Sequence, residues 1–236
     1  MQILDIGANI GYYPLIERSL IGKEKKIVAI EPVLENIQIL KKNLFLNNDN
    51  STVVLEGAVS NKNGYDNFYV SEHFNLGTFH FEGTSTKFLN KNHSIKVKVF
   101  KLIDVCMREG FPDLIRMDVE GHETKILEDL IVNNKKFLKL PMICFETHIS
   151  RYNKNNSMKK VLKKLFSLGY KIKLASSSSK KGTFILENKF FYKTSMDPIK
   201  TDEEVRKIFE NIKNEDAIKL ICNTGGLRTV LLCPKK

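Results

Sequence analysis

Short apolar runs alternate with longer amphipathic segments over roughly the first 170 residues of the chain. The apolar runs end in polar turns and predict buried strands near residues 2–6, 26–31, 52–58, 113–118 and 142–148. Apolar positions at three- and four-residue spacing predict helices near residues 11–21, 33–47, 101–109, 121–133 and 157–168. Such alternation is typical of an α/β fold with a mostly parallel sheet and helices on both faces.

The alternation is interrupted at residues 61–100, which contain glycines, aromatic residues and a two-residue apolar period near their end. This pattern predicts a β-hairpin insertion in place of one crossover helix. Further along the chain the pattern predicts strands near residues 170–174, 183–187, 190–193 and 228–233, and a helix over residues 202–212. No repeat or linker divides the sequence, so we predict one domain over residues 1–236, in which 176–226 is an elaboration of unassigned role.

The ends of the first two predicted strands are the most informative part of the sequence. Asp5 precedes a loop that begins at Gly7 and ends at Gly11, and Glu31-Pro32 closes the second strand. Glycines let the backbone bend and approach a ligand closely. A carboxylate at the end of the second strand is placed to accept hydrogen bonds from two ribose hydroxyls. We therefore expect a nucleoside-containing cofactor here, against the alternative of a strand–turn–helix that binds nothing. The candidate contacts in these two segments are Asp5, Gly7, Asn9, Gly11, Tyr12, Glu31 and Pro32.

The spacing of this loop argues against a dinucleotide. Pyrophosphate sites use G-x-G-x-x-G, whereas Asn9 stands here in place of the second glycine and bulky Tyr12 and Tyr13 follow. Asp5 would also repel a phosphate. S-adenosylmethionine fits better, because it has an ammonium, a sulfonium and a ribose diol but no phosphate. At the end of the third predicted strand, the small residues Gly57 and Ala58 would let its adenine ring lie against the backbone.

Further motifs follow in a characteristic order: Gly-Ala-Val-Ser at 57–60, Asp-Leu-Ile-Arg-Met-Asp-Val-Glu-Gly at 113–121 and Ile-Cys-Phe-Glu-Thr-His at 143–148. Together with Glu31 they resemble the FkbM-type methyltransferases, S-adenosylmethionine-dependent enzymes of which many are O-methyltransferases. The resemblance covers roughly residues 2–175 and implies a Rossmann-like class I methyltransferase fold. Arg116 stands where the family usually has lysine, and His122 where a small residue is common. Because the sequence starts almost at the first strand, we expect no N-terminal helix over the cofactor.

By analogy with methyltransferases of this architecture, the resemblance implies that Asp118, Glu120, Glu146 and His148 lie near one another. A hydroxyl is a weak nucleophile at neutral pH, so an acceptor of this kind benefits from a nearby base. His148 is the first candidate for that base, with Asp118 or Glu146 orienting it or sharing the role. A structural histidine at a strand end is an equal alternative. Asp118 is also a candidate for contact with the cofactor.

The same three side chains, Asp118, Glu146 and His148, offer oxygen and imidazole ligands that suit Mg²⁺ or a transition metal. Their spacing does not require an ion, and we predict no metal site.

Charge is distributed unevenly and raises a second candidate function. Residues 151–236 contain 20 Lys and Arg against 8 Asp and Glu, whereas residues 1–150 contain 18 against 19. A basic half suggests nucleic acid or another anionic partner. However, 32 of the 38 basic residues are lysine, and base recognition relies on arginine. Solvated lysines are the favoured interpretation, and an RNA or nucleic-acid methyltransferase remains the alternative.

No apolar stretch approaches the ~20 residues of a membrane span, and no signal peptide is visible. The four cysteines are scattered without metal-ligand spacing, which favours reduced thiols and a cytoplasmic location. We therefore expect an enzyme that methylates a hydroxyl of a sugar, glycolipid or secondary metabolite, with self-association as an open question. A methyltransferase fold that binds without catalysis is the third alternative.

Overall fold

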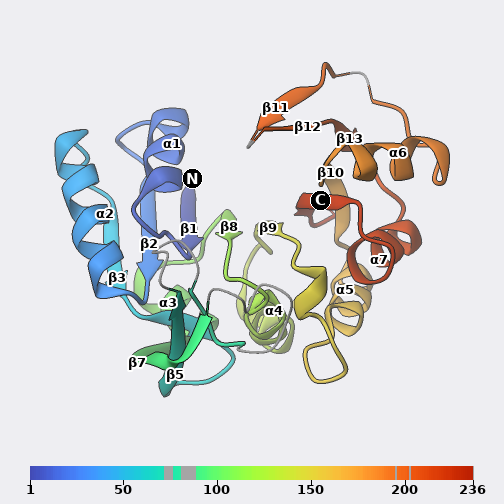
Figure 1. Cartoon of the computed structure of the whole chain (residues 1–236). Helices are drawn as coiled ribbons and strands as arrows, with labels where there is room; N and C mark the ends of the chain where they lie inside the picture. The colour runs from blue at the N-terminus through green and yellow to red at the C-terminus, as the bar shows by residue number, and fades with distance from the viewer. Residues whose placement is uncertain (72–76, 81–88, 195, 202, 236) are drawn as a thin grey trace. The chain divides into compact units, whose positions relative to one another are not determined.

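The computed structural model describes residues 1–71, 77–80, 89–194, 196–201 and 203–235 (Figure 1). It contains two compact units, Met1–Pro141 and Met142–Lys236. In the described residues, no helix combines the length and the apolar content that crossing a bilayer requires.

Four parallel strands form the main sheet of the first unit, in the order β8-β1-β2-β3. They are β1 (Gln2–Ile6), β2 (Lys26–Glu31), β3 (Val53–Glu56) and β8 (Leu114–Met117). Residues 27–30 of β2 are fully buried. Burial on both faces explains why these strands appear in the sequence as continuous apolar runs and not as an alternation.

Four α-helices connect or follow the parallel strands of the first unit. They are α1 (Tyr12–Ile21), α2 (Leu34–Leu46), α3 (Leu102–Glu109) and α4 (Glu123–Val132), with a short 3₁₀ turn at Asn134–Lys136. Because crossovers between parallel strands are right-handed, α1 and α2 cover one face of the sheet and α3 the other. The chain moves outward from β1 to β3 and then returns to β8 on the other side of β1. Open α/β sheets bind ligands at such a reversal, beyond the carboxyl ends of the strands.

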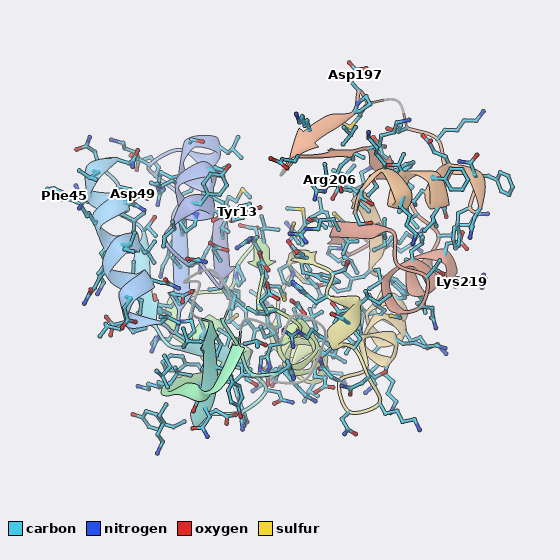
Figure 2. All side chains as sticks on the ribbon, viewed as in Figure 1. Tyr13, Phe45, Asp49, Asp197, Arg206 and Lys219 are labelled. Carbon is cyan, nitrogen blue, oxygen red and sulfur yellow. The ribbon has the colours of Figure 1, made fainter. Side chains whose placement is uncertain are left out.

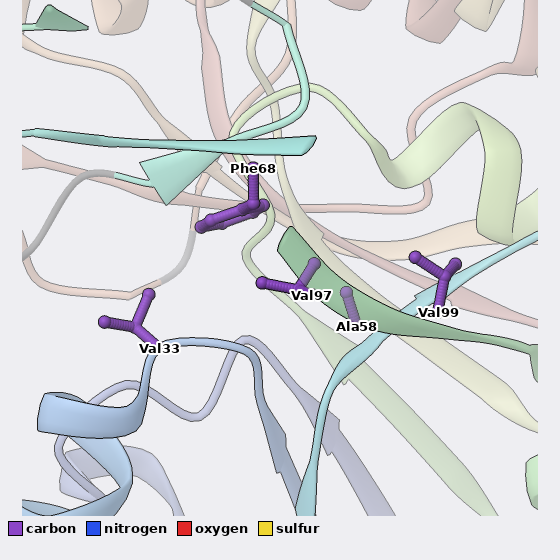
Figure 3. Close-up of a cluster of buried hydrophobic side chains, with 5 residues drawn as sticks. All are labelled: Val33, Ala58, Phe68, Val97 and Val99. Carbon is purple, nitrogen blue, oxygen red and sulfur yellow. The ribbon is translucent and has the colours of Figure 1, made fainter. Parts of the chain in front are cut away.

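The predicted β-hairpin insertion is present as a second sheet of the first unit. Its order is β4-β7-β5-β6, with β4 at Ala58–Ser60, β5 at Gly64–Ser71, β6 at Gly77–Thr78 and β7 at Leu89–Lys101. The long pair β5 and β7 is antiparallel, as the two-residue period predicts. A buried cluster of Val33, Ala58, Phe68, Val97 and Val99 packs this sheet against the start of α2 (Figure 3). Residues 72–76 and 81–88 of the predicted insertion lie outside the described residues.

In the second unit, β9 (Met142–Glu146), β10 (Lys171–Ser177), β13 (Ile208–Glu210) and β14 (Leu227–Cys233) pair in the order β13-β10-β14-β9. The pairs β9–β14, β14–β10 and β10–β13 are antiparallel. A separate antiparallel pair consists of β11 (Ile199–Thr201) and β12 (Glu204–Arg206). The helices are α5 (Met158–Ser167), α6 (Lys180–Asn188) and α7 (Asn214–Cys222), with a 3₁₀ turn at Ile149–Arg151.

Through β10 the predicted elements are present with ends shifted by a few residues, but beyond it several predictions are wrong. The segment 183–187, predicted as a strand, is part of helix α6. The side chain of the N-cap residue Ser179 accepts a hydrogen bond from the backbone N–H of Gly182. Residues 190–193 form no strand. The helix predicted over residues 202–212 is replaced by strands β12 and β13. Pairing with β10 buries Phe209 opposite Ala175, and this tertiary contact overrides the helical spacing.

A small buried core beneath α2 supports the loop after β1. Removing part of this core gives the first testable prediction. Leu40 is fully buried and packs with Ala8, Ala29 and Leu44. We expect Leu40→Ala to lower the free energy of unfolding by about 2–5 kcal/mol, because it removes buried methyl groups and leaves a cavity. Urea unfolding followed by circular dichroism measures this change.

Phe45→Ala on the same helix is the matched control, because the Phe45 side chain is 74% exposed (Figure 2). We expect it to change the free energy of unfolding by about 0.5 kcal/mol or less. Equal effects of the two substitutions would contradict the packing described for α2.

Candidate functional site

A cavity of about 520 Å³ lies in the first unit, where the chain leaves the strand ends. Its wall consists mainly of residues 6–10, 30–33, 57–59, 116 and 118–120, which lie at or just after the ends of β1, β2, β3 and β8. Most of the sequence-predicted cofactor residues line it: Gly7, Asn9, Tyr12, Glu31, Pro32, Gly57, Ala58 and Asp118. The structure therefore brings together, in one cavity, residues that lie more than a hundred positions apart in the sequence.

The glycines of the first loop are required by neighbouring parts of the chain. Gly7 has φ 80°, and a Cβ atom there would lie 2.2 Å from the Asp118 carbonyl oxygen. Gly11 has φ 92°, and a Cβ atom there would lie 2.6 Å from Leu40 Cδ1. Both residues let the loop pass close to β8 and α2, so a side chain at either position would displace the backbone. Gly11 is not part of the cavity wall.

Glu31 is a buried carboxylate on the cavity wall, and its own chain holds it in place. It is 5% exposed. Its Oε2 accepts a hydrogen bond from the Asn9 backbone at 2.9 Å, and its Oε1 accepts from the Val33 backbone and Asn36 Nδ2, both at 3.1 Å. Burial raises the pKa of Glu31, and these three donors oppose that shift. Since a carboxylate has about four acceptor positions, the three bonds leave roughly one for a ligand hydroxyl.

Asp5 lies behind the cavity wall. It is fully buried, and its Oδ1 accepts a hydrogen bond from Arg116 Nη1 at 3.1 Å. Burial raises the pKa of Asp5, and the neighbouring guanidinium opposes that shift. The partner of Asp5 in the structure is thus a residue of the chain, and a contact between Asp5 and the cofactor stays a prediction.

Arg116 is on the cavity wall and connects three parts of the site. Its Nη1 lies 3.4 Å from the Gly7 carbonyl oxygen, and its Nη2 lies 3.4 Å from Asp118 Oδ2. Its guanidinium carbon is 3.6 Å from the centre of the Tyr13 ring. Burial lowers the pKa of Arg116, but Asp5 and Asp118 raise it by more, so the side chain stays charged. The sequence marked Arg116 only as a departure from the family pattern.

His122 is a second wall residue whose place the sequence did not predict. Its Nε2 lies 2.9 Å from Ser60 Oγ and its Nδ1 lies 3.3 Å from His80 Nε2. The centre of its ring lies 4.5 Å from that of Phe79, with the two ring planes tilted by 39°. Burial, and to a smaller extent the electrostatic effects of His80, Lys125 and Lys62, lowers the pKa of His122 to about 3, so the imidazole is neutral. The partners come from the insertion, and no sequence spacing could have identified them.

The two other predicted catalytic residues belong to the second unit. Glu146 ends β9, and His148 Nε2 lies 3.5 Å from Glu146 Oε1. Arg228 of β14, which the sequence did not single out, places Nη1 2.6 Å from the same oxygen. The Tyr152 hydroxyl accepts a hydrogen bond from the His148 backbone at 3.1 Å. The structure thus brings His148 and Glu146 together, and the closeness of Asp118 to this pair stays a prediction.

Comparison with known proteins identifies the family. The model of the methyltransferase FkbM domain matches residues 5–172. The structure of an FkbM methyltransferase from Methylobacillus flagellatus KT is 15% identical, with a TM-score of 0.47 over 89% of this chain and 43% of that one. An S-adenosylmethionine-dependent O-methyltransferase from Thermotoga maritima is 11% identical, with a TM-score of 0.42 over 100% of this chain and 60% of that one. No curated protein matches the sequence.

This chain therefore spans less than two thirds of the length of either solved structure. The family assignment depends on the family model, which covers most of the chain. The parallel strands, with a cavity where their order reverses, fit the α/β fold of class I methyltransferases, although open α/β sheets in general share these features. The chain belongs to the FkbM methyltransferase family, which confirms the family and the fold class predicted from the sequence.

Glu17 of α1 generates a prediction about pH and stability. It is 7% exposed, and its Oε2 has no hydrogen-bond partner among the residues that the structure describes. Burial, and then the Asp5 charge, raises the pKa of Glu17 from 4.5 to about 8. Between these two pH values the folded chain binds a proton that the unfolded chain has lost, so folding becomes less favourable as pH rises.

Glu17→Gln removes this proton-linked loss. We expect wild type and variant to have similar free energies of unfolding below about pH 4.5 and the variant to be the more stable above about pH 8, with a difference that grows across this window. Urea unfolding at a series of pH values measures it. A difference that is constant with pH would contradict the buried, protonated state of Glu17.

Proposed function

We propose that this protein is an S-adenosylmethionine-dependent O-methyltransferase whose acceptor is a hydroxyl of a sugar, glycolipid or secondary metabolite. The observation that carries the proposal is the Glu31 carboxylate, buried on the cavity wall and fixed by three donors of its own chain. A preorganised carboxylate at the end of the second strand suits the hydroxyls of a ribose. The cavity wall has both polar and apolar residues, which suits S-adenosylmethionine because it combines a charged amino-acid end with an adenine ring.

Different residues of the cavity wall are proposed to bind different parts of the cofactor. Glu31 accepts a hydrogen bond from the ribose. The small residues Gly57 and Ala58 and the apolar Val33 offer a surface for the adenine ring. Arg116 and Asp118 form the charged part of the wall, which suits the amino-acid end of the cofactor. When bound, S-adenosylmethionine supplies an electrophilic methyl group, and the protein's task is to align the acceptor and receive its proton.

His148 is the proposed base for the acceptor hydroxyl. Glu146, 3.5 Å from His148 Nε2, is the proposed positioning residue, and Arg228 in turn fixes the Glu146 carboxylate. An imidazole suits this role because its ordinary pKa is close to neutral pH. Asp118 is proposed to share in catalysis or to contact the cofactor.

The first test of this function is cofactor binding. We expect Glu31→Gln to weaken binding of S-adenosylhomocysteine at least about tenfold, because the neutral amide presents one acceptor oxygen where the carboxylate presents two. Isothermal titration calorimetry measures the dissociation constant. Glu35→Gln is the control and should bind as wild type, because Glu35 is an exposed residue in the first turn of α2. Unchanged binding by Glu31→Gln would argue against the proposal.

The second test concerns the base. We expect His148→Ala to lower kcat by about 10²-fold or more while the dissociation constant of S-adenosylhomocysteine stays unchanged, because the residue serves the acceptor. Incorporation of isotope-labelled methyl groups into separate glycan, lipid and RNA fractions identifies the acceptor class. Incorporation into RNA alone would favour the nucleic-acid alternative. Loss of activity with EDTA would favour the metal alternative at Asp118, Glu146 and His148.

A cytoplasmic location and a single domain stay predictions from the sequence, and self-association stays an open question.

A further inference from the structure

The charges on the cavity wall are unequal in number. Its acidic residues are Glu31, Asp118 and Glu120. Among the described residues of the wall, Arg116 is the one lysine or arginine, and His122 is neutral. A negatively charged group of a ligand therefore has a single cationic side chain to approach.

The Arg116 side chain is held rigidly but retains binding capacity. Within the chain, its Nη1 contacts Asp5 and Gly7 and its Nη2 contacts Asp118, and the last two contacts are long, at 3.4 Å. Nε has no partner among the residues that the structure describes, and the side chain is 11% exposed. A guanidinium has five N–H donors in a fixed fork, so donors remain for a further acceptor. The face of Tyr13 at 3.6 Å limits the movement of the fork.

We propose that Arg116 binds the α-carboxylate of S-adenosylmethionine and makes the site selective for cofactor molecules that carry this group. The inference rests on the proposed function. The cofactor has one anionic group, and among the wall residues that the structure describes Arg116 is the one lysine or arginine to receive it. A guanidinium suits a carboxylate better than an ammonium does, because two parallel N–H donors match its two oxygens. Asp118, on the far side of the fork, is placed to attract the neighbouring ammonium of the same molecule.

A purely structural role for Arg116 is the competing interpretation. In that case the guanidinium only neutralises buried Asp5, and removing the ligand's carboxylate changes nothing at this position. The two interpretations differ in whether affinity depends on the carboxylate. Comparing ligands that differ only there separates them, with binding as the readout and without any turnover.

The first experiment uses the wild-type protein and calorimetry. The two probes are S-adenosylhomocysteine and its decarboxylated analogue, which keeps the ammonium, thioether and nucleoside. We expect the analogue to bind at least about tenfold more weakly, the loss typical of a hydrogen-bonded pair of charges. Equal affinity of the two probes would overturn the proposal whatever the variants show.

The second experiment assigns the preference to Arg116. We expect Arg116→Gln to bind the two probes within about twofold of each other, and circular dichroism checks that the variant is folded. Arg116→Lys keeps the charge but loses the fork, and an intermediate preference is expected. Arg18→Gln is the matched control, because Arg18 is also buried in the first unit, pairs with Asp49 at 3.0 Å and is not on the cavity wall.

The outcomes separate this inference from the proposed function. The full wild-type preference in Arg116→Gln, or in Arg116→Lys if the glutamine variant does not fold, would overturn the role of Arg116. A loss of preference in Arg18→Gln of the same size would do so too, since any buried arginine would then have this effect. If the wild-type protein binds neither probe, the proposed function itself fails.

Discussion

The hydrogen bonds that hold Glu31 are the constraint on which the site depends. The carboxylate ends β2, yet it accepts from the loop after β1 through Asn9 and from the start of α2 through Val33 and Asn36. One buried side chain thus fixes the spacing of two loops that form the cavity wall. A buried carboxylate is costly unless donors satisfy it, so the arrangement makes sense only with the loops in place. Because these loops are already ordered before binding, a ligand does not lose affinity to the entropy cost of ordering them.

A second polar network, formed by Asp5, Arg116 and Asp118, connects β1 to β8 at the point where the strand order reverses. Burying such charges stabilises a fold little, because desolvation offsets much of their attraction. Their presence is easier to explain by chemistry at the cavity than by stability. On the wall itself, Glu31 and Asp118 are acidic, and Arg116 is the one lysine or arginine among the described wall residues. This pattern suits a nucleoside that carries both an ammonium and a carboxylate better than a nucleotide.

How far the sequence predicted this protein depends on the kind of signal. The elements of the first unit followed from buried apolar runs, and most cofactor candidates share one cavity because parallel strands bring their carboxyl ends together. The positions of Arg116 and His122 depended on contacts with Tyr13, Ser60 and His80, which no spacing encodes. In residues 202–212 the local pattern was misleading. The apolar spacing there is helical, but the segment forms strands because pairing with β10 buries Phe209.

The central claim is that a nucleoside cofactor occupies the cavity of the first unit with its ribose at Glu31. Co-crystallisation with S-adenosylhomocysteine tests it most directly. We expect the ligand within the wall formed by residues 6–10, 30–33, 57–59, 116 and 118–120, with a ribose oxygen at hydrogen-bond distance, about 2.5–3.0 Å, from the Glu31 carboxylate. A cavity that stays empty at saturating ligand, or one that holds a phosphate-bearing nucleotide instead, would contradict it.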